Sequence, residues 1–281
     1  MRTMKIKEEK DYKYPTKEEI IKQMDTLWEQ EEMKEIKKII KETEDMKKLN
    51  IWCLFDDCYG SWNKFSQDQE DHYISIGIND NNWNNYYKIN LSIQNENLIK
   101  ELEKLPKPDI IVASPPCESW SIADNQQRLW REQQGNNIKV HLKSDIEHNN
   151  KTMYPTRKRD YYKQWRTTLN GISTTLGLLK VIEHFKPPIW IIENPASSKI
   201  WEFINENVGL IGYKNKTYYN AYDLNFTKKP TIFFSNVCLD LKKDHIKQLI
   251  PWEKTIGYDK RSSIPQELLK DIIKQVKERY E

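Results

Sequence analysis

Short apolar runs alternate along this chain with polar turns and one amphipathic stretch. Residues 109–113 (DIIVA) and 189–192 (IWII) each hold an apolar run of strand length. Between them, residues 174–185 (TTLGLLKVIEHF) place leucines and isoleucines at helical spacing. The order strand, helix, strand predicts a right-handed parallel crossover. The fold expected from this pattern is α/β, with both strands ending at one edge of the sheet.

The two strands deliver chemically useful residues to that edge. The first runs into Pro115-Pro116-Cys117, and the two prolines restrict the backbone ahead of the sulfur. Cys117 is therefore a candidate nucleophile, although a buried structural thiol explains the same pattern. The second strand ends in Glu193, and a lone glutamate there is commonly a surface or capping residue. A cysteine and a glutamate at two strand ends of one sheet favour a site.

Four motifs in order resemble those of the DNA cytosine-5 methyltransferases. Residues 114–117 (SPPC) resemble the family's Pro-Cys motif, and residues 193–195 (ENP) its Glu-Asn motif. Residues 219–236 resemble the strand region that usually carries Gln-x-Arg-x-Arg, in a Lys-Pro-Thr version similar to small phage-type members. Residues 261–269 (RSSIPQELL) resemble the final motif. The resemblance spans about residues 50–275 and implies a Rossmann-like methyltransferase fold with a mostly parallel sheet.

The resemblance also implies a mechanism. Attack of the Cys117 thiolate on carbon 6 of cytosine makes carbon 5 nucleophilic enough to accept a methyl group. Glu193 would hydrogen-bond ring nitrogen 3, which requires a buried carboxyl group. The base must leave the duplex first, so double-stranded DNA is the expected partner and base flipping the expected step. The residues expected to line the pocket are Ser114, Pro116 and Asn194.

The cofactor half departs from the family pattern. A strand ending in Phe-x-Gly-x-Gly is expected to approach S-adenosylmethionine, and here residues 55–62 read FDDCYGSW. Asp57 stands in or near the place of the first glycine, where a side chain narrows the room for the cofactor. The ribose-binding acid falls on Gly77, Asn79 or Asp80, of which only Asp80 could do this work. The cofactor residues expected from the resemblance are Phe55, Asp57, Gly60, Ser61, Trp62, Asp80, Asn90 and Ser263.

Composition is compatible with one such domain. The chain has 281 residues, 37% hydrophobic and 31% charged, with a net charge of only +3. Any nucleic-acid surface must therefore come from local clustering. The four cysteines show no metal-ligand spacing, so no metal is expected, and free thiols fit a reducing cytoplasm. We find no signal-peptide pattern and no apolar run of membrane-span length.

Three further segments stand apart. Residues 1–48 predict an N-terminal helical extension to the 49–281 catalytic domain; it packs on that domain or forms a homodimer or partner-protein contact. Residues 122–172 form a basic and aromatic insertion that suits nucleic acid. Residues 237–260 are too short for an ordinary target-recognition domain. The residues predicted to contact DNA are Arg128, Arg131, Arg157, Lys158, Arg159, Lys229 and Thr231.

Three hypotheses follow. The leading one is a cytosine-5 methyltransferase acting on DNA with S-adenosylmethionine. The second is a DNA-binding relative or subunit that keeps the pocket and has lost cofactor affinity, which is favoured if Asp57 fills the methionine pocket. The third keeps the chemistry of Cys117 and Glu193 and changes the substrate to tRNA or the donor to another molecule.

Overall fold

The computed structural model describes residues 16–17, 22, 34, 48–57, 59–120, 132–133, 137–138, 143–152, 160–244 and 263–280. The chain divides into two compact units, residues 1–48 and 49–281. The helices expected in the first unit lie almost wholly outside the described residues. No helix in the described ranges is both long and apolar enough to cross a membrane.

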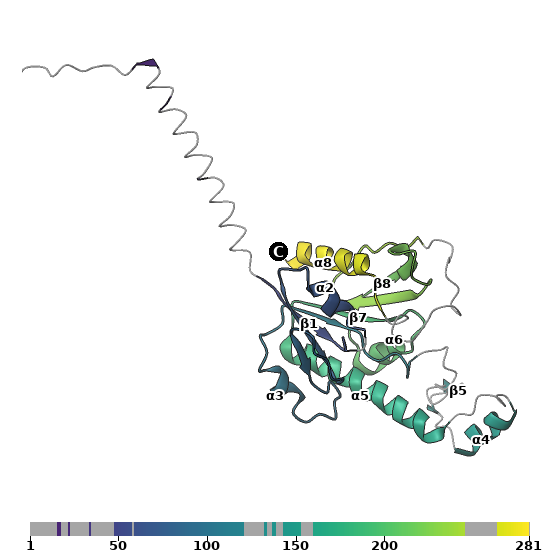
Figure 1. Cartoon of the computed structure of the whole chain (residues 1–281). Coiled ribbons are helices and arrows are strands. Elements are labelled where there is room, and N and C mark those ends of the chain that lie inside the picture. The colour runs from purple at the N-terminus through teal and green to yellow at the C-terminus, as the bar shows by residue number, and fades with distance from the viewer. Residues whose placement is uncertain are drawn as a thin grey trace, which may run out of the picture. The chain divides into compact units, whose positions relative to one another are not determined.

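A seven-stranded sheet forms the centre of the second unit, in the order β3-β2-β1-β4-β7-β9-β8 (Figure 1). Strands β3, β2, β1, β4 and β7 are parallel, whereas β9 runs antiparallel to both β7 and β8. The strands are β1 (Asn50–Leu54), β2 (His72–Gly77), β3 (Tyr86–Lys88), β4 (Ile110–Ala113), β7 (Ile189–Pro195), β8 (Tyr213–Tyr218) and β9 (Pro230–Ser235). This order confirms the mostly parallel, Rossmann-like methyltransferase fold. The strand order reverses between β1 and β4, where such sheets bind ligands.

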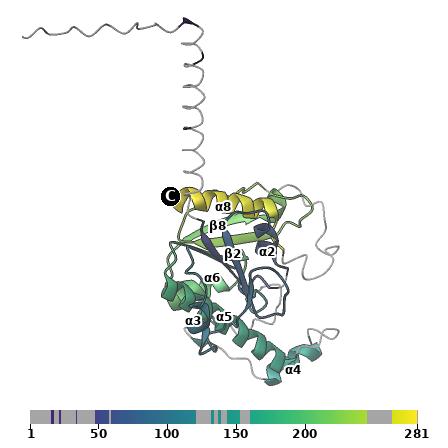
Figure 2. The ribbon, with the colours of Figure 1, turned by 60° about the vertical axis from the view of Figure 1, so that its left-hand side comes forward.

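Helices cover both faces of the sheet (Figures 1 and 2). Those on one face are α3 (Leu98–Leu102), α5 (Tyr161–Phe185) and α6 (Ile200–Phe203), the last continuing into a π-helical turn (Ile204–Val208). Those on the other are α2 (Ser61–Ser66) and α8 (Gln266–Tyr280). The insertion contributes α4 (Lys143–Thr152) and a small hairpin of β5 (Glu132–Gln133) and β6 (Asn137–Ile138).

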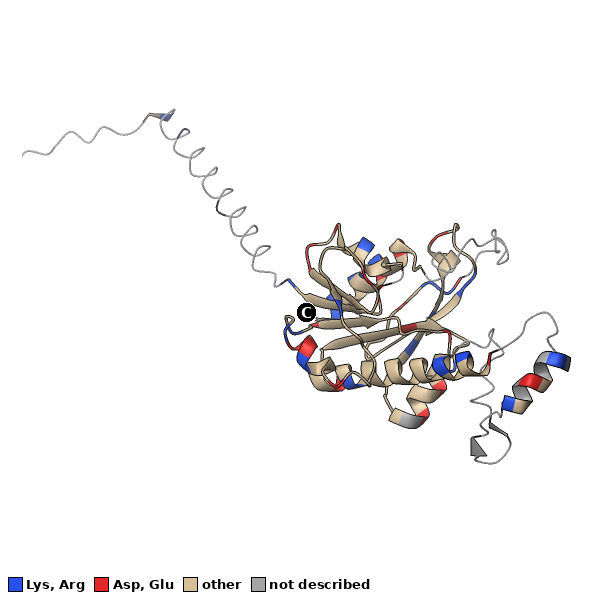
Figure 3. Cartoon of the chain, turned by 60° about the horizontal axis from the view of Figure 1, so that its bottom comes forward, with Lys and Arg blue, Asp and Glu red and all other residues tan. Residues whose placement is uncertain are grey.

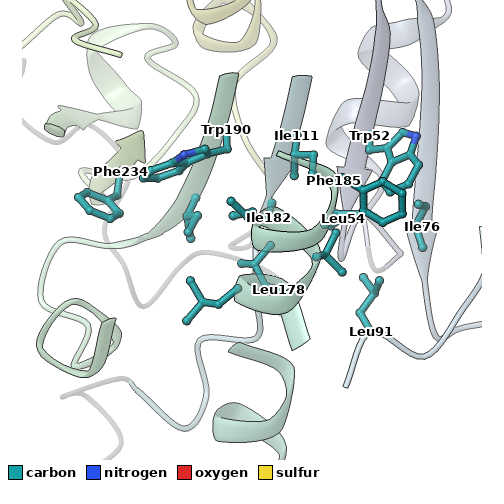
Figure 4. Packing of buried hydrophobic residues seen from close by; sticks show 14 of the residues in the cluster. Trp52, Leu54, Ile76, Leu91, Ile111, Leu178, Ile182, Phe185, Trp190 and Phe234 are labelled. Atoms are coloured by element: carbon teal, nitrogen blue, oxygen red, sulfur yellow. The ribbon is translucent and has the colours of Figure 1, made fainter. Parts of the chain in front are cut away.

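Alternate residues of each central strand feed two separate cores, as the period of a strand requires. Trp52 and Leu54 of β1 enter the core beneath α5, whereas Ile51 and Cys53 enter the core beneath α8. The α5 residues Leu178, Ile182 and Phe185 pack against the first set, as Figure 4 shows. The near-continuous apolar runs in the sequence therefore reflect strands buried on both faces.

Helix α5 provides the predicted crossover between β4 and β7, which pair in parallel. Its amino end is capped by the Asp160 carboxylate, which accepts the Lys163 N–H at 2.6 Å. It ends at Lys186, which has a left-handed φ of 45° and precedes Pro187 and Pro188. Two prolines cannot continue a helix, so the chain turns directly into β7. Within the helix, a side chain at Gly177 would stand 2.0 Å from the Leu91 carbonyl oxygen, so glycine is needed for this close approach.

Candidate active site at the carboxyl edge of the sheet

The cysteine segment leaves β4 and turns back on itself. The Ser114 N–H donates to the Leu54 carbonyl at 3.1 Å, which continues the β1–β4 pairing past the end of the strand. Trp120 N–H then donates to the Cys117 carbonyl at 3.0 Å and closes a turn. Pro115 is buried, whereas Cys117 is partly exposed. Buried Pro115 thus fixes the start of the segment, and the partly accessible Cys117 thiol lies at the carboxyl edge of the sheet.

A direct hydrogen bond joins this segment to the end of β7. Asn194 Nδ2 donates to the Pro115 carbonyl oxygen at 2.9 Å, and Asn194 is fully buried. Since Ala113 pairs with Ile192, Glu193 lies one residue beyond the paired positions, beside the cysteine segment. The expectation that Cys117 and Glu193 emerge on the same edge is therefore confirmed.

Glu193 is 8% exposed and has two partners, both at the same oxygen. The Tyr219 hydroxyl donates to Oε1 at 3.0 Å, and Lys229 Nζ lies 3.9 Å from Oε1. Lys229 Nζ also lies 4.7 Å from the centroid of the Tyr219 ring. The carboxyl group is buried, as the chemistry requires, yet it keeps a cation and a strong donor beside it.

Tyr219 follows β8 in a short 3-10 turn and is 1% exposed. Burial, together with the neighbouring Glu193 charge, raises the pKa of its hydroxyl well above 10. A hydrogen bond with Thr231 lowers that pKa in part, and Cys117 lies near enough to influence it. The two motif residues Cys117 and Glu193 thus share Tyr219 as a neighbour.

Among the described residues, buried polar atoms without a hydrogen-bond partner at this edge include Ser114 Oγ and Asn194 Oδ1. Leaving a buried acceptor unsatisfied costs free energy of about 1–3 kcal/mol. Both atoms belong to residues that the sequence predicts to line the pocket.

The cofactor half begins at the end of β1 with Phe55, which has a left-handed φ of 62°. The next residue, Asp56, turns its carboxylate into the amino end of α2. It accepts N–H bonds from Trp62 and Asn63, at 3.1 and 2.8 Å, and the Ser75 hydroxyl at 2.9 Å. Burial raises the pKa of Asp56 to about 7 against the lowering effect of these three donors. Asp56 therefore serves as a buried helix cap.

Asp57 points toward the end of β2. Its Oδ2 accepts the N–H groups of Ile78 and Asn79 at 2.7 and 3.0 Å. A Cβ at Gly77 would stand 2.2 Å from the Asp57 Cβ, so the Asp57 side chain already occupies the space a side chain at position 77 would need. An acid is thus present at the end of β2, and it comes from the loop after β1.

Asp80, the residue expected to bind ribose, has an exposed side chain. Its carboxylate pairs with Lys88 Nζ at 2.6 Å on the surface, with 89% of the side chain exposed. Asn90 is also exposed, and its Oδ1 accepts the Ser92 N–H at 3.1 Å. The residues on either side of Asp80 contact the loop after β1: the Asn79 N–H donates to Asp57 Oδ2 and Asn81 Nδ2 donates to the Asp57 carbonyl oxygen, both at 3.0 Å.

The glycine turn and the final motif do meet. Gly60 has a φ of +63°, and a Cβ there would stand 2.6 Å from the Trp83 ring. The Ile264 N–H donates to Ser61 Oγ at 3.0 Å, so the segment with buried Ser263 packs against the start of α2. Trp62, expected at the cofactor, lies instead in the core beneath α8 and is 3% exposed.

A cavity of about 270 Å³ adjoins the cysteine segment. Glu118 and Ser119 form one wall, and the first half of α5 forms the other with Lys163, Arg166, Thr167 and Asn170. Ser119 Oγ donates to the Thr167 carbonyl at 2.8 Å. A Cβ at Gly171 would stand 2.0 Å from Ser119 Oγ, so glycine lets the helix and the cysteine segment touch.

The predicted DNA contacts divide into two groups. Lys229 and Thr231 lie at the site, where Thr231 is fully buried and supports Tyr219. The described residues do not include Arg128, Arg131, Arg157, Lys158 and Arg159, nor residues 245–260 of the short recognition region. Elsewhere on this unit, Lys and Arg are interspersed with Asp and Glu (Figure 3).

Sequence reasoning missed Tyr219, Asp56 and Gly171. Tyr219 stands among motif residues, but no local pattern indicates that its hydroxyl reaches Glu193 from 26 positions away. Asp56 is six residues before the first N–H it caps, which is outside the spacing of an ordinary N-cap. Gly171 lies inside a helix, where an isolated glycine is a weak signal of close packing.

Comparison with known proteins supports the family resemblance. Residues 49–138 match the family model of the C-5 cytosine-specific DNA methylases, which confirms the resemblance and supports methyl transfer. This match includes Cys117 and ends before Glu193. No match was found among curated proteins. A solved structure described as a ribosomal RNA methyltransferase from Plasmodium falciparum is similar at 15% identity, with a TM-score of 0.33, over 72% of this chain and 92% of that one.

Proposed function

We propose that this protein transfers a methyl group from S-adenosylmethionine to carbon 5 of cytosine in DNA, with Cys117 as nucleophile and Glu193 as the acid that activates the ring. The observation that carries the proposal is the hydrogen bond between Asn194 and Pro115, which ties the two motif segments together. Glu193 supplies a buried carboxyl group with one oxygen engaged, and Cys117 supplies a partly exposed thiol.

The reaction follows from these groups. The Cys117 sulfur forms a bond to carbon 6 while Glu193 hydrogen-bonds nitrogen 3, where negative charge develops. Carbon 5 then takes the methyl group, its proton passes to a water molecule, and the bond between sulfur and carbon 6 breaks, which returns the Cys117 thiolate and the aromatic ring. Ser114 Oγ and Asn194 Oδ1 are unsatisfied acceptors for the amino group of an extruded base.

The residues at the ends of β1 and β2 fit a nucleoside-bearing cofactor. Gly60 allows a tight backbone turn, Phe55 and Trp83 offer aromatic surfaces, and the Asp57 carboxylate lies at the end of β2, where ribose hydroxyls are commonly bound. S-adenosylmethionine would supply an electrophilic methyl group there. We infer that Asp57, rather than Asp80, holds the ribose.

Double-stranded DNA is the proposed partner. The wall of α5 beside the cysteine segment carries Lys163 and Arg166, which suit phosphates flanking an extruded nucleotide. The Glu118 carboxylate in the same cavity repels a phosphate and so offsets part of this attraction.

A second candidate function rests on a specific observation. Trp83 packs against Gly60, and Asp57 fills the space above Gly77, so side chains of the chain itself narrow the cofactor region. A DNA-binding relative without cofactor affinity would show the same crowding.

One experiment separates the two candidates. The purified protein is incubated with tritiated S-adenosylmethionine and duplex DNA containing 5-fluorocytosine, beside a Cys117→Ala variant. Fluorine cannot leave carbon 5 as the proton does, so methyl transfer traps the covalent adduct. We expect a denaturation-resistant, labelled adduct that the variant does not form. DNA binding without any adduct, on DNA of varied sequence, would instead support the non-catalytic candidate.

A further inference from the structure

We propose that Tyr219 is a positioning residue that fixes which oxygen of Glu193 faces the target base. The inference rests on the proposed function, because it concerns the same carboxyl group. It starts from one geometric fact: both partners of Glu193 contact Oε1. In the described part of the chain, Oε2 has no protein partner, so this oxygen is the one left for a ligand.

Tyr219 and Lys229 differ in how strongly they can orient the Glu193 carboxyl group. The Tyr219 hydroxyl lies 3.0 Å from Oε1, within the distance of a directional hydrogen bond. Lys229 Nζ, at 3.9 Å, is too far for one and acts as a nearby charge. The orientation of the carboxyl group therefore depends on the tyrosine, while the lysine offsets part of the cost of burying a charge.

The tyrosine itself is fixed. It is 1% exposed, packs edge-on against Phe226 with ring centroids 6.1 Å apart, and shares a hydrogen bond with Thr231. Water cannot replace its hydroxyl at this burial. Because burial raises its pKa well above 10, the hydroxyl stays a donor over the whole accessible pH range.

A chemical consequence follows for the acid. Because Oε1 accepts the hydrogen bond from the Tyr219 hydroxyl, a protonated Glu193 carries its own proton on Oε2. This Oε2–H group can then donate a hydrogen bond to nitrogen 3 of the base. Without Tyr219, the proton and the side chain can take either arrangement. The groups that face Glu193 in this argument are Tyr219 before β9, Lys229 at the start of β9, and Cys117 after β4.

The test removes one hydroxyl and compares it with a matched control. Tyr219→Phe keeps the buried ring. Tyr222→Phe removes a hydroxyl that donates to the Asp271 carboxylate at 2.7 Å, away from Glu193. Rates of adduct formation with 5-fluorocytosine DNA are measured from pH 6 to 9 for both variants, in the wild-type and Glu193→Gln backgrounds, after equal thermal unfolding confirms that all are folded.

We expect Tyr219→Phe to slow adduct formation on the order of 10-fold. In the Glu193→Gln background the same change should alter the rate less than about twofold, since no carboxyl proton remains to be placed. Equal losses in both backgrounds, or a profile identical to that of Tyr222→Phe, would overturn the inference.

A second measurement does not depend on methyl transfer. In protein labelled with carbon-13 at glutamate Cδ, the Glu193 resonance is identified by its loss in Glu193→Gln. Tyr219→Phe should move this resonance, and Tyr222→Phe should not. If wild-type protein forms no adduct, the proposed function fails, and this spectrum alone decides whether Tyr219 orients Glu193. An unmoved resonance contradicts the inference whatever the adduct result.

Discussion

Two buried carboxyl groups, Glu193 and Asp56, stand at the carboxyl ends of neighbouring parts of one sheet and have opposite surroundings. Glu193 has a cation and a tyrosine at one oxygen and a second oxygen without a protein partner in the described residues. Asp56 has both oxygens engaged by three neutral donors. Burial raises the pKa of Asp56 to about 7, yet nothing remains for a ligand to contact. Burial alone therefore does not distinguish the two acids, whereas the presence of an oxygen without a partner in the described residues does.

The same contrast separates the two halves of the site. The Cys117–Glu193 edge keeps its motif residues and links them by a direct hydrogen bond. At the ends of β1 and β2 the motif positions are used differently: Asp56 caps helix α2, and Asp57 contacts the backbone at the end of β2.

The largest effect should come from Asp56. Its pKa is raised from 3.8 to about 7 by burial, so the folded state holds a proton that the unfolded state has lost between these values. The contribution of Asp56 to the free energy of unfolding should therefore be largest below about pH 4 and be lost as pH rises through about 7, by up to about 4 kcal/mol.

Urea unfolding at several pH values checks this sign. Asp56→Asn should lose most of the pH-dependent slope, whereas Asp80→Asn, at an exposed carboxylate, should keep it. The same slope in the wild type and in Asp56→Asn would show that Asp56 ionises in the fold as it does in the unfolded chain.

Gly171→Ala should damage the catalytic edge. The added Cβ would lie 2.0 Å from Ser119 Oγ and must displace the cysteine segment. We expect a loss of stability of about 1–3 kcal/mol and a rate of adduct formation about 100-fold lower. Ser119→Gly removes the clashing atoms, so the double variant should regain part of the rate. A Gly171→Ala protein with the wild-type rate would show that the close contact between Gly171 and Ser119 does not determine the position of Cys117.

Asp57→Ala should weaken the cofactor half alone. We expect about 10-fold weaker binding of S-adenosylhomocysteine by calorimetry, because a charged hydrogen-bond partner of the ribose is lost. Affinity for DNA should not change. Asp80→Ala is the matched control and should leave cofactor binding unchanged; the reverse outcome would return the ribose contact to Asp80.

The smallest effects should lie on α5. Lys163→Gln and Arg166→Gln should each weaken DNA binding a few-fold and lower the salt slope by about one phosphate contact. Lys180→Gln, an exposed position near the other end of the same helix, should change neither. Filter binding across a salt series measures both quantities, and equal slopes for all three variants would remove this wall from the DNA surface.

Most of the sheet could be predicted from the sequence, because strands buried on both faces produce unbroken apolar runs that end in Cys117 and Glu193. The connections around those residues could not. The Asn194–Pro115 bond spans 79 positions, and the Tyr219–Glu193 bond spans 26. Such contacts depend on strand order and register, which local patterns do not encode. The burial of Trp62 was also beyond sequence reasoning, because a motif position does not say which face of a short helix enters the core.

The pairing of Asp57 with Gly77 also limits how this sequence can change over generations. An acid cannot be placed at position 77 while Asp57 keeps its Cβ, because the two atoms would lie 2.2 Å apart. Glycine at position 57, in turn, removes the carboxylate that Asp57 brings to the end of β2. The acid can therefore move from one position to the other only through an intermediate that lacks it at both. Related sequences should therefore carry one arrangement or the other, with the two positions changing together.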